Sequence, residues 1–346
     1  MPSLENDSGS NDEFREVQCI SLGDYVIDIS WSPDGTRLGA VTVEGLVYLV
    51  HVSDDAMHYN QIGHHATGGN ALSWRLDGLE FATAGQDGTV KIWDGHSGEE
   101  LCSLPMSDPW VSKVAYNPKS KFLAASGGKT VSVWKDDRSL IYESHDHAST
   151  ISDLAWNPDG SGLAVAAYYG VTIHVPNKQS KPRKYKWKGS SLVLSWSPDA
   201  KYIATGEQDS TVHFWHRKSG DDARMWGFST KVLELSWDAS GRWLATGGGP
   251  IISLWDCSGP GPSGRQPRQL LGHRNKLTQL AFQPNGDLLA SADADSSICL
   301  WDPMNNTQAL HKDKLSSPAT CLRWSNNGHL AVGQRDGSIT TFSTTN

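Results

Sequence analysis

Apolar residues recur along this chain in short runs that alternate with turns rich in Pro, Asp and Gly. Val232, Leu235 and Trp237 show the pattern, because apolar side chains stand five and two positions before an aromatic residue. Short runs of this kind, bounded by turn residues, predict β-strands. Since no segment shows a 3.6-residue apolar period over ten residues, the sequence predicts an all-β fold.

Residues 72–94 contain one complete set of these signals. The aromatic Trp74 ends a first strand, and the turn that follows leads into a second strand at residues 80–84. Asp87-Gly88 is a hairpin signal, because Gly tolerates the positive φ that a tight turn requires. A third strand at residues 89–94 and a weaker fourth strand complete the unit.

The same unit recurs eight times at intervals of 40–45 residues. Its aromatic anchors are Trp31, Trp74, Tyr116, Trp156, Trp196, Trp237, Phe282 and Trp324. A fixed period of this length indicates a repeat architecture in which each unit is completed by its neighbours.

The repeat resembles the WD40 family, whose members form β-propellers. The pair Trp-Asp ends three units, at Trp93-Asp94, Trp255-Asp256 and Trp301-Asp302. The pair Gly-His stands near unit starts at Gly63-His64 and Gly272-His273. The resemblance extends over about residues 14–343 and implies a closed ring of four-stranded blades.

Counting repeats predicts eight four-stranded blades; the alternative is seven blades with one degenerate unit outside the ring. Residues 14–20 precede the first unit, and in propellers such a strand completes the last blade and removes two open sheet edges. The expected organisation is a disordered acidic tail at residues 1–13 and a single propeller domain at residues 14–346.

The resemblance also implies buried hydrogen-bonded sets of His, Ser or Thr, Asp and Trp, which are stabilising when every member is satisfied. One set is expected at His65 (or His64), Thr83, Asp87 and Trp93. The other is expected at His273, Ser291, Asp295 and Trp301. The fifth unit has Trp187 where these units have His, and the fourth keeps His147 but lacks the Trp.

The net charge of −8 argues against general nucleic-acid binding, which needs a basic surface. Five cysteines without a CxxC pair favour free thiols in a reducing compartment, so an intracellular, cytoplasmic protein is expected, or a nuclear one in a eukaryote. No apolar run approaches the roughly 18 residues of a membrane-spanning helix, and residues 1–13 lack the features of a signal peptide.

Two chemical hypotheses remain as alternatives. His64-His65 and His145-Asp146-His147 are the densest histidine clusters, but each offers fewer ligands than a structural zinc requires. Three residues before the anchors, Asp28, Asp153 and Glu234 could converge on the centre of a ring. Since the sequence has no nucleophile elbow or phosphate-binding loop, no enzyme activity, metal or cofactor is expected.

Eleven of the fifteen tryptophans occupy anchor or third-strand positions; of the other four, Trp110, Trp187 and Trp226 lie in or near expected loops and are candidates for binding. Aromatic residues in loops are common interface anchors. The candidate partner-binding residues are Trp110, Tyr168, Tyr169, Trp187, Trp226, Phe228, Lys184 and Lys186. They would form an aromatic patch over the third to sixth units; alternatively the aromatic residues, Trp187 above all, replace missing His-Asp sets by packing.

Residues 178–188 contain six basic and two aromatic residues. They could hold an acidic protein or RNA, or protect an outer sheet edge from aggregation. A flexible insertion at residues 258–264 is expected on the opposite face. The leading hypothesis is a non-catalytic scaffold for proteins or peptides, monomeric within a larger complex; the alternatives are a metal-dependent or enzymatic propeller and an RNA-binding propeller.

Overall fold

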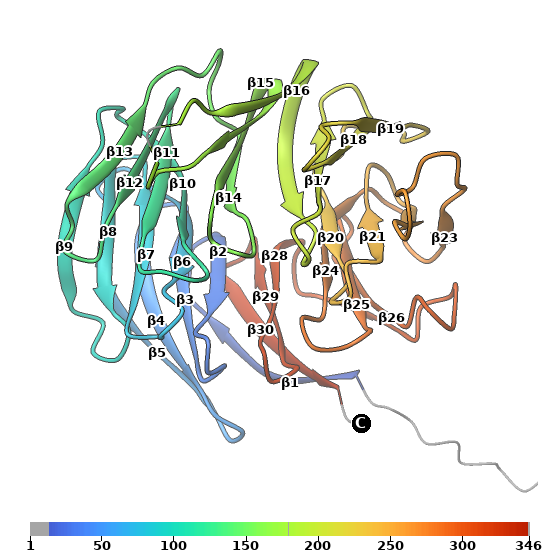
Figure 1. Cartoon of the computed structure of the whole chain (residues 1–346). Helices are drawn as coiled ribbons and strands as arrows, with labels where there is room; N and C mark the ends of the chain where they lie inside the picture. The colour runs from blue at the N-terminus through green and yellow to red at the C-terminus, as the bar shows by residue number, and fades with distance from the viewer. Residues whose placement is uncertain (1–13, 179, 345–346) are drawn as a thin grey trace, which may run out of the picture.

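A computed structural model describes residues 14–178 and 180–344 of the chain. Within these residues the protein forms thirty β-strands and no helix, so none of the described segments is a helix able to cross a membrane. The predicted acidic tail at residues 1–13 lies outside the described residues. Figure 1 shows the strands arranged in a ring, with the blue start and the red end of the chain side by side.

Most strands belong to antiparallel four-stranded sheets that follow one another along the chain. The first three are β2 (Val26–Trp31), β3 (Arg37–Thr42), β4 (Leu46–Val52) and β5 (Met57–His64); β6 (Gly69–Trp74), β7 (Glu80–Gly85), β8 (Thr89–Asp94) and β9 (Glu100–Pro105); and β10 (Val111–Tyr116), β11 (Leu123–Gly127), β12 (Thr130–Trp134) and β13 (Leu140–Ser144).

A six-stranded sheet follows, made of β14 (Asp153–Trp156), β15 (Leu163–His174), β16 (Arg183–Trp196), β17 (Tyr202–Glu207), β18 (Val212–His216) and β19 (Asp222–Met225). The next two sheets are β20 (Leu235–Trp237), β21 (Trp243–Thr246), β22 (Ile252–Asp256) and β23 (Arg268–Leu270); and β24 (Leu277–Phe282), β25 (Leu289–Asp293), β26 (Ser297–Trp301) and β27 (His311–Lys314).

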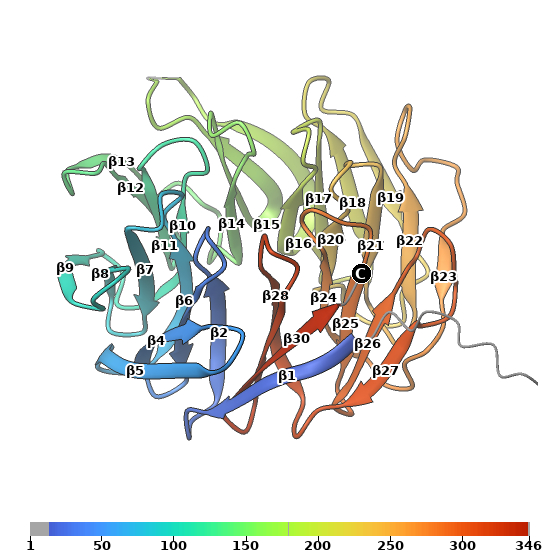
Figure 2. The ribbon, with the colours of Figure 1, turned by 90° about the horizontal axis from the view of Figure 1, so that it is seen from below.

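The last sheet joins the two ends of the described chain. It contains β28 (Ala319–Trp324), β29 (Leu330–Gln334), β30 (Ser338–Thr344) and β1 (Phe14–Ser21). Figure 2 shows β1 lying along β30, and the rings of Phe14 and Phe342 stack with centroids 4.7 Å apart. The N-terminal strand therefore closes the last blade, as the count of strands predicts.

The prediction of eight separate four-stranded blades is wrong, because the hydrogen-bonded strands form seven sheets. The alternative of seven is the supported number, although no unit lies outside the ring. The fourth and fifth repeats instead share the six-stranded sheet through β16, which pairs with β15 at its start and with β17 at its end. The physical reason is that residues 183–196 stay extended where other repeats have a loop between sheets.

Within this sheet β15 reverses direction at Tyr168–Gly170. A Cβ placed on Gly162 would lie 3.2 Å from Ile173 and 3.5 Å from the carbonyl of His174, so the two ends of β15 are neighbours. Tyr169 and Gly170 have φ of 74° and 97°, which is the left-handed region of a tight turn. The fourth repeat therefore presents a hairpin tip made of two tyrosines.

The aromatic anchors explain why successive repeats stay in register. Trp74 donates from Nε1 to the carbonyl of Ser30 at 2.9 Å, and Trp31 donates to the carbonyl of Arg323 at 2.9 Å, which ties the first repeat to the last. Trp156, Trp196 and Trp324 make the equivalent bond to the preceding repeat. Apolar side chains fill the space between neighbouring sheets, so the core is distributed around the ring.

Candidate functional site

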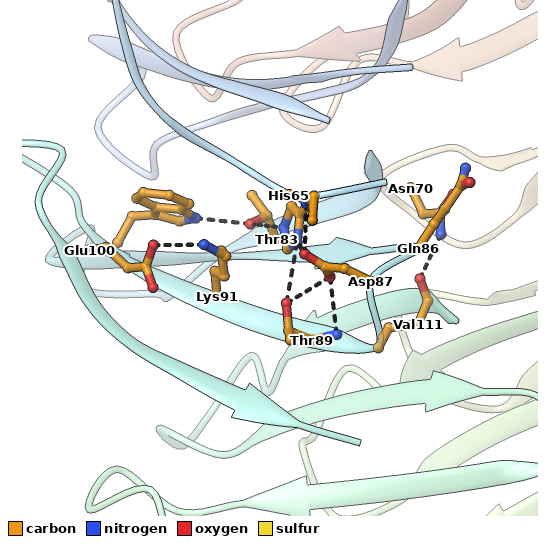
Figure 3. A network of polar contacts seen from close by, with 11 residues as sticks. His65, Asn70, Thr83, Gln86, Asp87, Thr89, Lys91, Glu100 and Val111 are labelled. Atoms are coloured by element: carbon orange, nitrogen blue, oxygen red, sulfur yellow. Dashed lines mark hydrogen bonds and ion pairs between the residues drawn. The ribbon is translucent and has the colours of Figure 1, made fainter. Parts of the chain in front are cut away.

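The second repeat contains the predicted polar set in full (Figure 3). His65 is 1 % exposed; its Nε2 lies 2.8 Å from Thr83 Oγ1 and its Nδ1 lies 3.1 Å from the Asp87 carboxylate. Trp93 donates from Nε1 to the same Thr83 oxygen at 2.9 Å. Burial lowers the pKa of His65, so the ring is neutral at pH 7 and each of its nitrogens is satisfied. These residues hold the fold together.

The seventh repeat corrects one predicted member. His273 Nε2 lies 2.7 Å from Ser291 Oγ, and Trp301 donates to the same oxygen at 2.8 Å. The carboxylate on His273 Nδ1 belongs to Asp293 at 2.9 Å, whereas Asp295 is exposed and pairs with Lys314. Asp293 ends β25 and its side chain accepts from the amides of Asp295 and Ser297, so it caps the turn in which Asp295 lies.

The fourth repeat replaces the missing tryptophan with a second histidine. His174 Nε2 lies 3.2 Å from His147 Nε2, and its Nδ1 lies 2.7 Å from the hydroxyl of Tyr142 on the preceding sheet. Burial lowers the pKa of His147 to about 4 and that of His174 to about 3. The hydrogen bond to His174 occupies Nε2 of His147, and His145 contacts Thr130 and Glu143.

The fifth repeat fills the histidine position by stacking. Trp187 is half-buried; its ring centroid lies 3.9 Å from that of His213, and the Arg224 guanidinium carbon lies 5.0 Å from the Trp187 ring centroid. These contacts correspond to the alternative in which Trp187 replaces a His-Asp set by packing. Glu207 is fully buried; its Oε1 accepts from Ser191 and Thr205, and its Oε2 has no partner among the described residues. Burial raises the pKa of Glu207.

Two of the three carboxylates that stand three residues before an anchor form ion pairs; the third, Glu234, is buried, and burial raises its pKa. Asp28 accepts from Arg323 at 2.7 Å, and Asp153 lies 3.4 Å from Lys113. The attraction of Asp153 raises the pKa of Lys113, and that of Asp28 raises the pKa of Arg323. Each carboxylate also accepts a backbone amide of the next repeat, from Leu72 and Leu194 respectively. Asp28 and Asp153 therefore link each repeat to its neighbours.

The candidate aromatic residues do not form one patch. Trp110 is 53 % exposed before β10, and the remaining exposed residues divide between two hollows on neighbouring repeats. Within the described residues no group of three or more His, Cys, Asp or Glu side chains is placed to hold a metal ion. The two hollows are therefore the strongest candidate sites.

The first hollow, the Trp226 pocket, has a volume of about 440 Å³. Trp226 is 75 % exposed, and Phe228 stands beside it, packed toward Trp255. The facing wall is formed by residues 262–267, the second half of the insertion between β22 and β23. Of the insertion expected at residues 258–264, residues 262–264 line this hollow, whereas Gly259 accepts a hydrogen bond from the hydroxyl of Tyr202 at 3.0 Å.

The second hollow, the tyrosine–lysine pocket, has a volume of about 410 Å³. Tyr168 and Tyr169 form the hairpin tip, with ring centroids 4.2 Å apart. The exposed Lys184 and Lys186 of β16 form one wall, and His147 with Asp146 forms another. Sequence reasoning selected these tyrosines and lysines, but it did not place them beside His147.

Comparison with known proteins agrees with this architecture. The profile of the WD40 family (WD domain, G-beta repeat) matches residues 58–94, 98–135, 138–170, 185–216, 224–256 and 264–302. The chain belongs to the WD40 family. This WD40 propeller also superimposes on the crystal structure of the computationally designed Ika8 protein with a TM-score of 0.80, at 18 % identity and covering 95 % of this chain and 99 % of that one. That likeness shows the fold alone.

The chain also matches several curated proteins, one of them named as a WD-repeat protein. Over 270 residues the WD40 propeller is 26 % identical to cell division cycle 20.5, cofactor of APC complex, from Arabidopsis thaliana, covering 72 % of this chain and 59 % of that protein. It is 23 % identical to WD repeat-containing protein slp1 of Schizosaccharomyces pombe, covering 81 % and 59 %. For telomerase protein component 1 of Mus musculus the values are 23 %, 90 % and 12 %. The chain thus spans less than two thirds of each of these relatives.

Proposed function

We propose that this WD40 propeller is a non-catalytic adaptor that presents a rigid ring to protein or peptide partners within a larger complex. The observation that carries the proposal is Trp226, a large apolar side chain that is 75 % exposed at the edge of the Trp226 pocket. An exposed tryptophan beside a preformed hollow is the usual form of an interface anchor, because its burial removes much apolar area from water at small entropic cost.

Three further observations support an adaptor over an enzyme. Two of the three candidate acids, Asp28 and Asp153, are bound by basic side chains and backbone amides. Among the relatives, the Arabidopsis protein is described as a cofactor of the APC complex, which is a role in a protein assembly. The closed ring also fits a scaffold, because its loops are held by a stable framework.

The test is affinity purification of the tagged full chain from cells of its native organism, with isotopic labelling to quantify partners. The wild type should recover at least one protein near stoichiometry. Trp226→Ala should reduce that recovery, because loss of a central aromatic anchor of about 2 kcal/mol weakens binding by about 30-fold.

The matched control is Leu76→Ala, which removes an apolar side chain that is 60 % exposed in the turn between β6 and β7. It should recover the same partner as the wild type. The proposal is overturned if no protein is recovered near stoichiometry, or if Trp226→Ala and Leu76→Ala recover the partner equally.

A further inference from the structure

The polar set of the fourth repeat lacks its carboxylate. In the second and seventh repeats the histidine Nδ1 contacts Asp87 or Asp293, at 3.1 Å and 2.9 Å. Asp87 stands thirteen positions after its anchor and Asp293 stands eleven after its own; in the fourth repeat these two positions hold Tyr169 and Ala167, so neither supplies a carboxylate. His147 Nδ1 therefore has no hydrogen-bond partner among the described residues, and this histidine lines the tyrosine–lysine pocket.

Two cations stand at the same place. Lys184 and Lys186 line the pocket and are exposed, and within the described part of the chain neither forms an ion pair. By contrast, Lys91 of the second repeat is held by Glu100 at 2.8 Å. Unpaired ammonium groups beside a vacant carboxylate position make the pocket complementary to an anionic side chain.

We propose that the tyrosine–lysine pocket binds a Glu or Asp side chain of an acidic peptide segment, whose carboxylate takes the place that Asp87 occupies in the second repeat. The carboxylate accepts from His147 Nδ1–H and from the ammonium groups of Lys184 and Lys186. Tyr168 and Tyr169 offer ring faces to the neighbouring part of the peptide. This inference rests on the proposed adaptor function and specifies one of its binding surfaces.

The hydrogen-bond chain behind His147 supports this polarity. The Tyr142 hydroxyl can donate to His174 Nδ1, and His174 Nε2–H then donates to His147 Nε2. Such an order leaves the hydrogen of His147 on Nδ1, where it faces the vacant position. Burial keeps the pKa of His147 at about 4, so the ring acts as a neutral donor at pH 7.

A peptide fits the pocket better than RNA does. Asp146 lines the pocket with the two lysines, and the whole chain carries a net charge of −8. A phosphate backbone needs a continuous basic groove to replace its counterions, whereas one carboxylate needs only a few donors. RNA is therefore the competing outcome of the test.

The test is fluorescence anisotropy with a fluorescein-labelled hexaglutamate peptide, a matched hexaglutamine peptide and a labelled oligouridine RNA. Hexaglutamate should bind the full chain saturably, and hexaglutamine should not. Lys184→Ala with Lys186→Ala should weaken binding at least about tenfold, since each charge-assisted bond contributes more than about 1.4 kcal/mol. The matched control, Lys178→Ala with Lys181→Ala, removes the same charge outside the pocket and should bind as the wild type does.

A second pair of variants tests the vacant position itself. Tyr169→Asp would supply an internal carboxylate to His147, so it should abolish hexaglutamate binding and raise the melting temperature. Tyr169→Asn introduces a side chain of the same size and turn preference as Asp but without the charge. It should retain hexaglutamate binding that Tyr169→Asp loses. The ¹⁵N resonance of His147 Nδ1 should shift on titration of the wild type with hexaglutamate.

Three results would overturn the inference. These are equal weakening by the two lysine pairs, equal binding of hexaglutamine, or tighter binding of the oligouridine through Lys184 and Lys186. Any of them leaves the adaptor proposal standing if the Trp226-dependent partner is still recovered. If no Trp226-dependent partner is recovered while hexaglutamate still binds, the Trp226 pocket is not the surface through which the adaptor acts.

Discussion

The Nε2 atoms of His147 and His174 lie 3.2 Å apart, so the two buried imidazoles share a single hydrogen. A second proton would place two N–H groups against each other in a site that is 8 % and 1 % exposed. Burial lowers both pKa values, to about 4 for His147 and about 3 for His174. Both folded values lie below the unfolded value of about 6.5, so this pair stabilises the fold above pH 6.5 and loses that contribution as the pH falls.

His174→Gln should therefore reduce the acid sensitivity of the fold. Between pH 7 and pH 4.5 the wild type should lose about 2 kcal/mol more of its free energy of unfolding than the variant, because one pKa unit corresponds to about 1.4 kcal/mol. Urea unfolding at a series of pH values measures the difference. His58→Gln, on the exposed strand β5, is the control and should follow the wild type; equal pH dependence in all three proteins would contradict the assignment.

Thr83→Val should destabilise the second repeat although it preserves side-chain shape. The change leaves Trp93 Nε1 and His65 Nε2 without their shared oxygen, and burial of unsatisfied polar groups costs about 1–3 kcal/mol. Chemical denaturation measures the loss. Thr307→Val, at an exposed position, should change stability by less than about 0.5 kcal/mol; a similar effect of both variants would show that the shared oxygen is unimportant.

Asp293→Asn and Asp295→Asn separate the two candidate carboxylates of the seventh repeat. Asp293 is 1 % exposed and accepts from His273 and two backbone amides, so its change should cost about 1–3 kcal/mol. Asp295 forms an exposed pair with Lys314, and its change should cost under about 1 kcal/mol. Thermal unfolding at pH 7 compares them, and a larger loss for Asp295→Asn would restore the assignment made from sequence.

Glu207→Gln should stabilise the protein at neutral pH. Burial raises the pKa of Glu207 above its ordinary value, so the charged form is disfavoured in the folded state and the penalty is present above the folded pKa. The amide removes this penalty and keeps an acceptor for Ser191 and Thr205. Calorimetry at pH 8 should show a melting temperature higher by about 2 °C or more, with the difference vanishing below pH 4.5.

The matched control for Glu207→Gln is Glu99→Gln, at an exposed position near the end of the β8–β9 turn. It removes the same charge without relieving burial and should leave the melting temperature unchanged. Destabilisation by Glu207→Gln at pH 8 would mean that the buried carboxylate is paired in solution.

Much of the architecture is predictable because short sequence segments specify it. The pattern around Trp74, the Asp87-Gly88 turn and the Trp93 position each specify local structure, and their repetition specifies the ring. The closing strand follows from the same pattern, since residues 14–20 precede the first unit. The set at His65 could be named because every member stands at a fixed distance from the anchor.

The errors arise where one repeat departs from that spacing. Asp293 takes the role assigned to Asp295 because it stands eleven positions after Phe282, where the second repeat has Gly85 after Trp74; the turns that follow, residues 86–88 and 294–296, have the same length. The sheet count changes because residues 183–196 continue as one strand across two repeats. Neither departure alters the pattern of apolar residues within its repeat, so the sequence of a single repeat does not reveal it.

The sequence by itself determined the strand content, the period of the repeat, the closure of the ring and most members of the buried polar sets. These depend on alternation and turn chemistry within about 40 residues. Only the tertiary structure decided which side chain fills a vacated position, such as His174 beside His147, and which loops meet, such as residues 262–267 beside Trp226. Those contacts join segments whose separation depends on sheet twist and ring geometry, which no local pattern encodes.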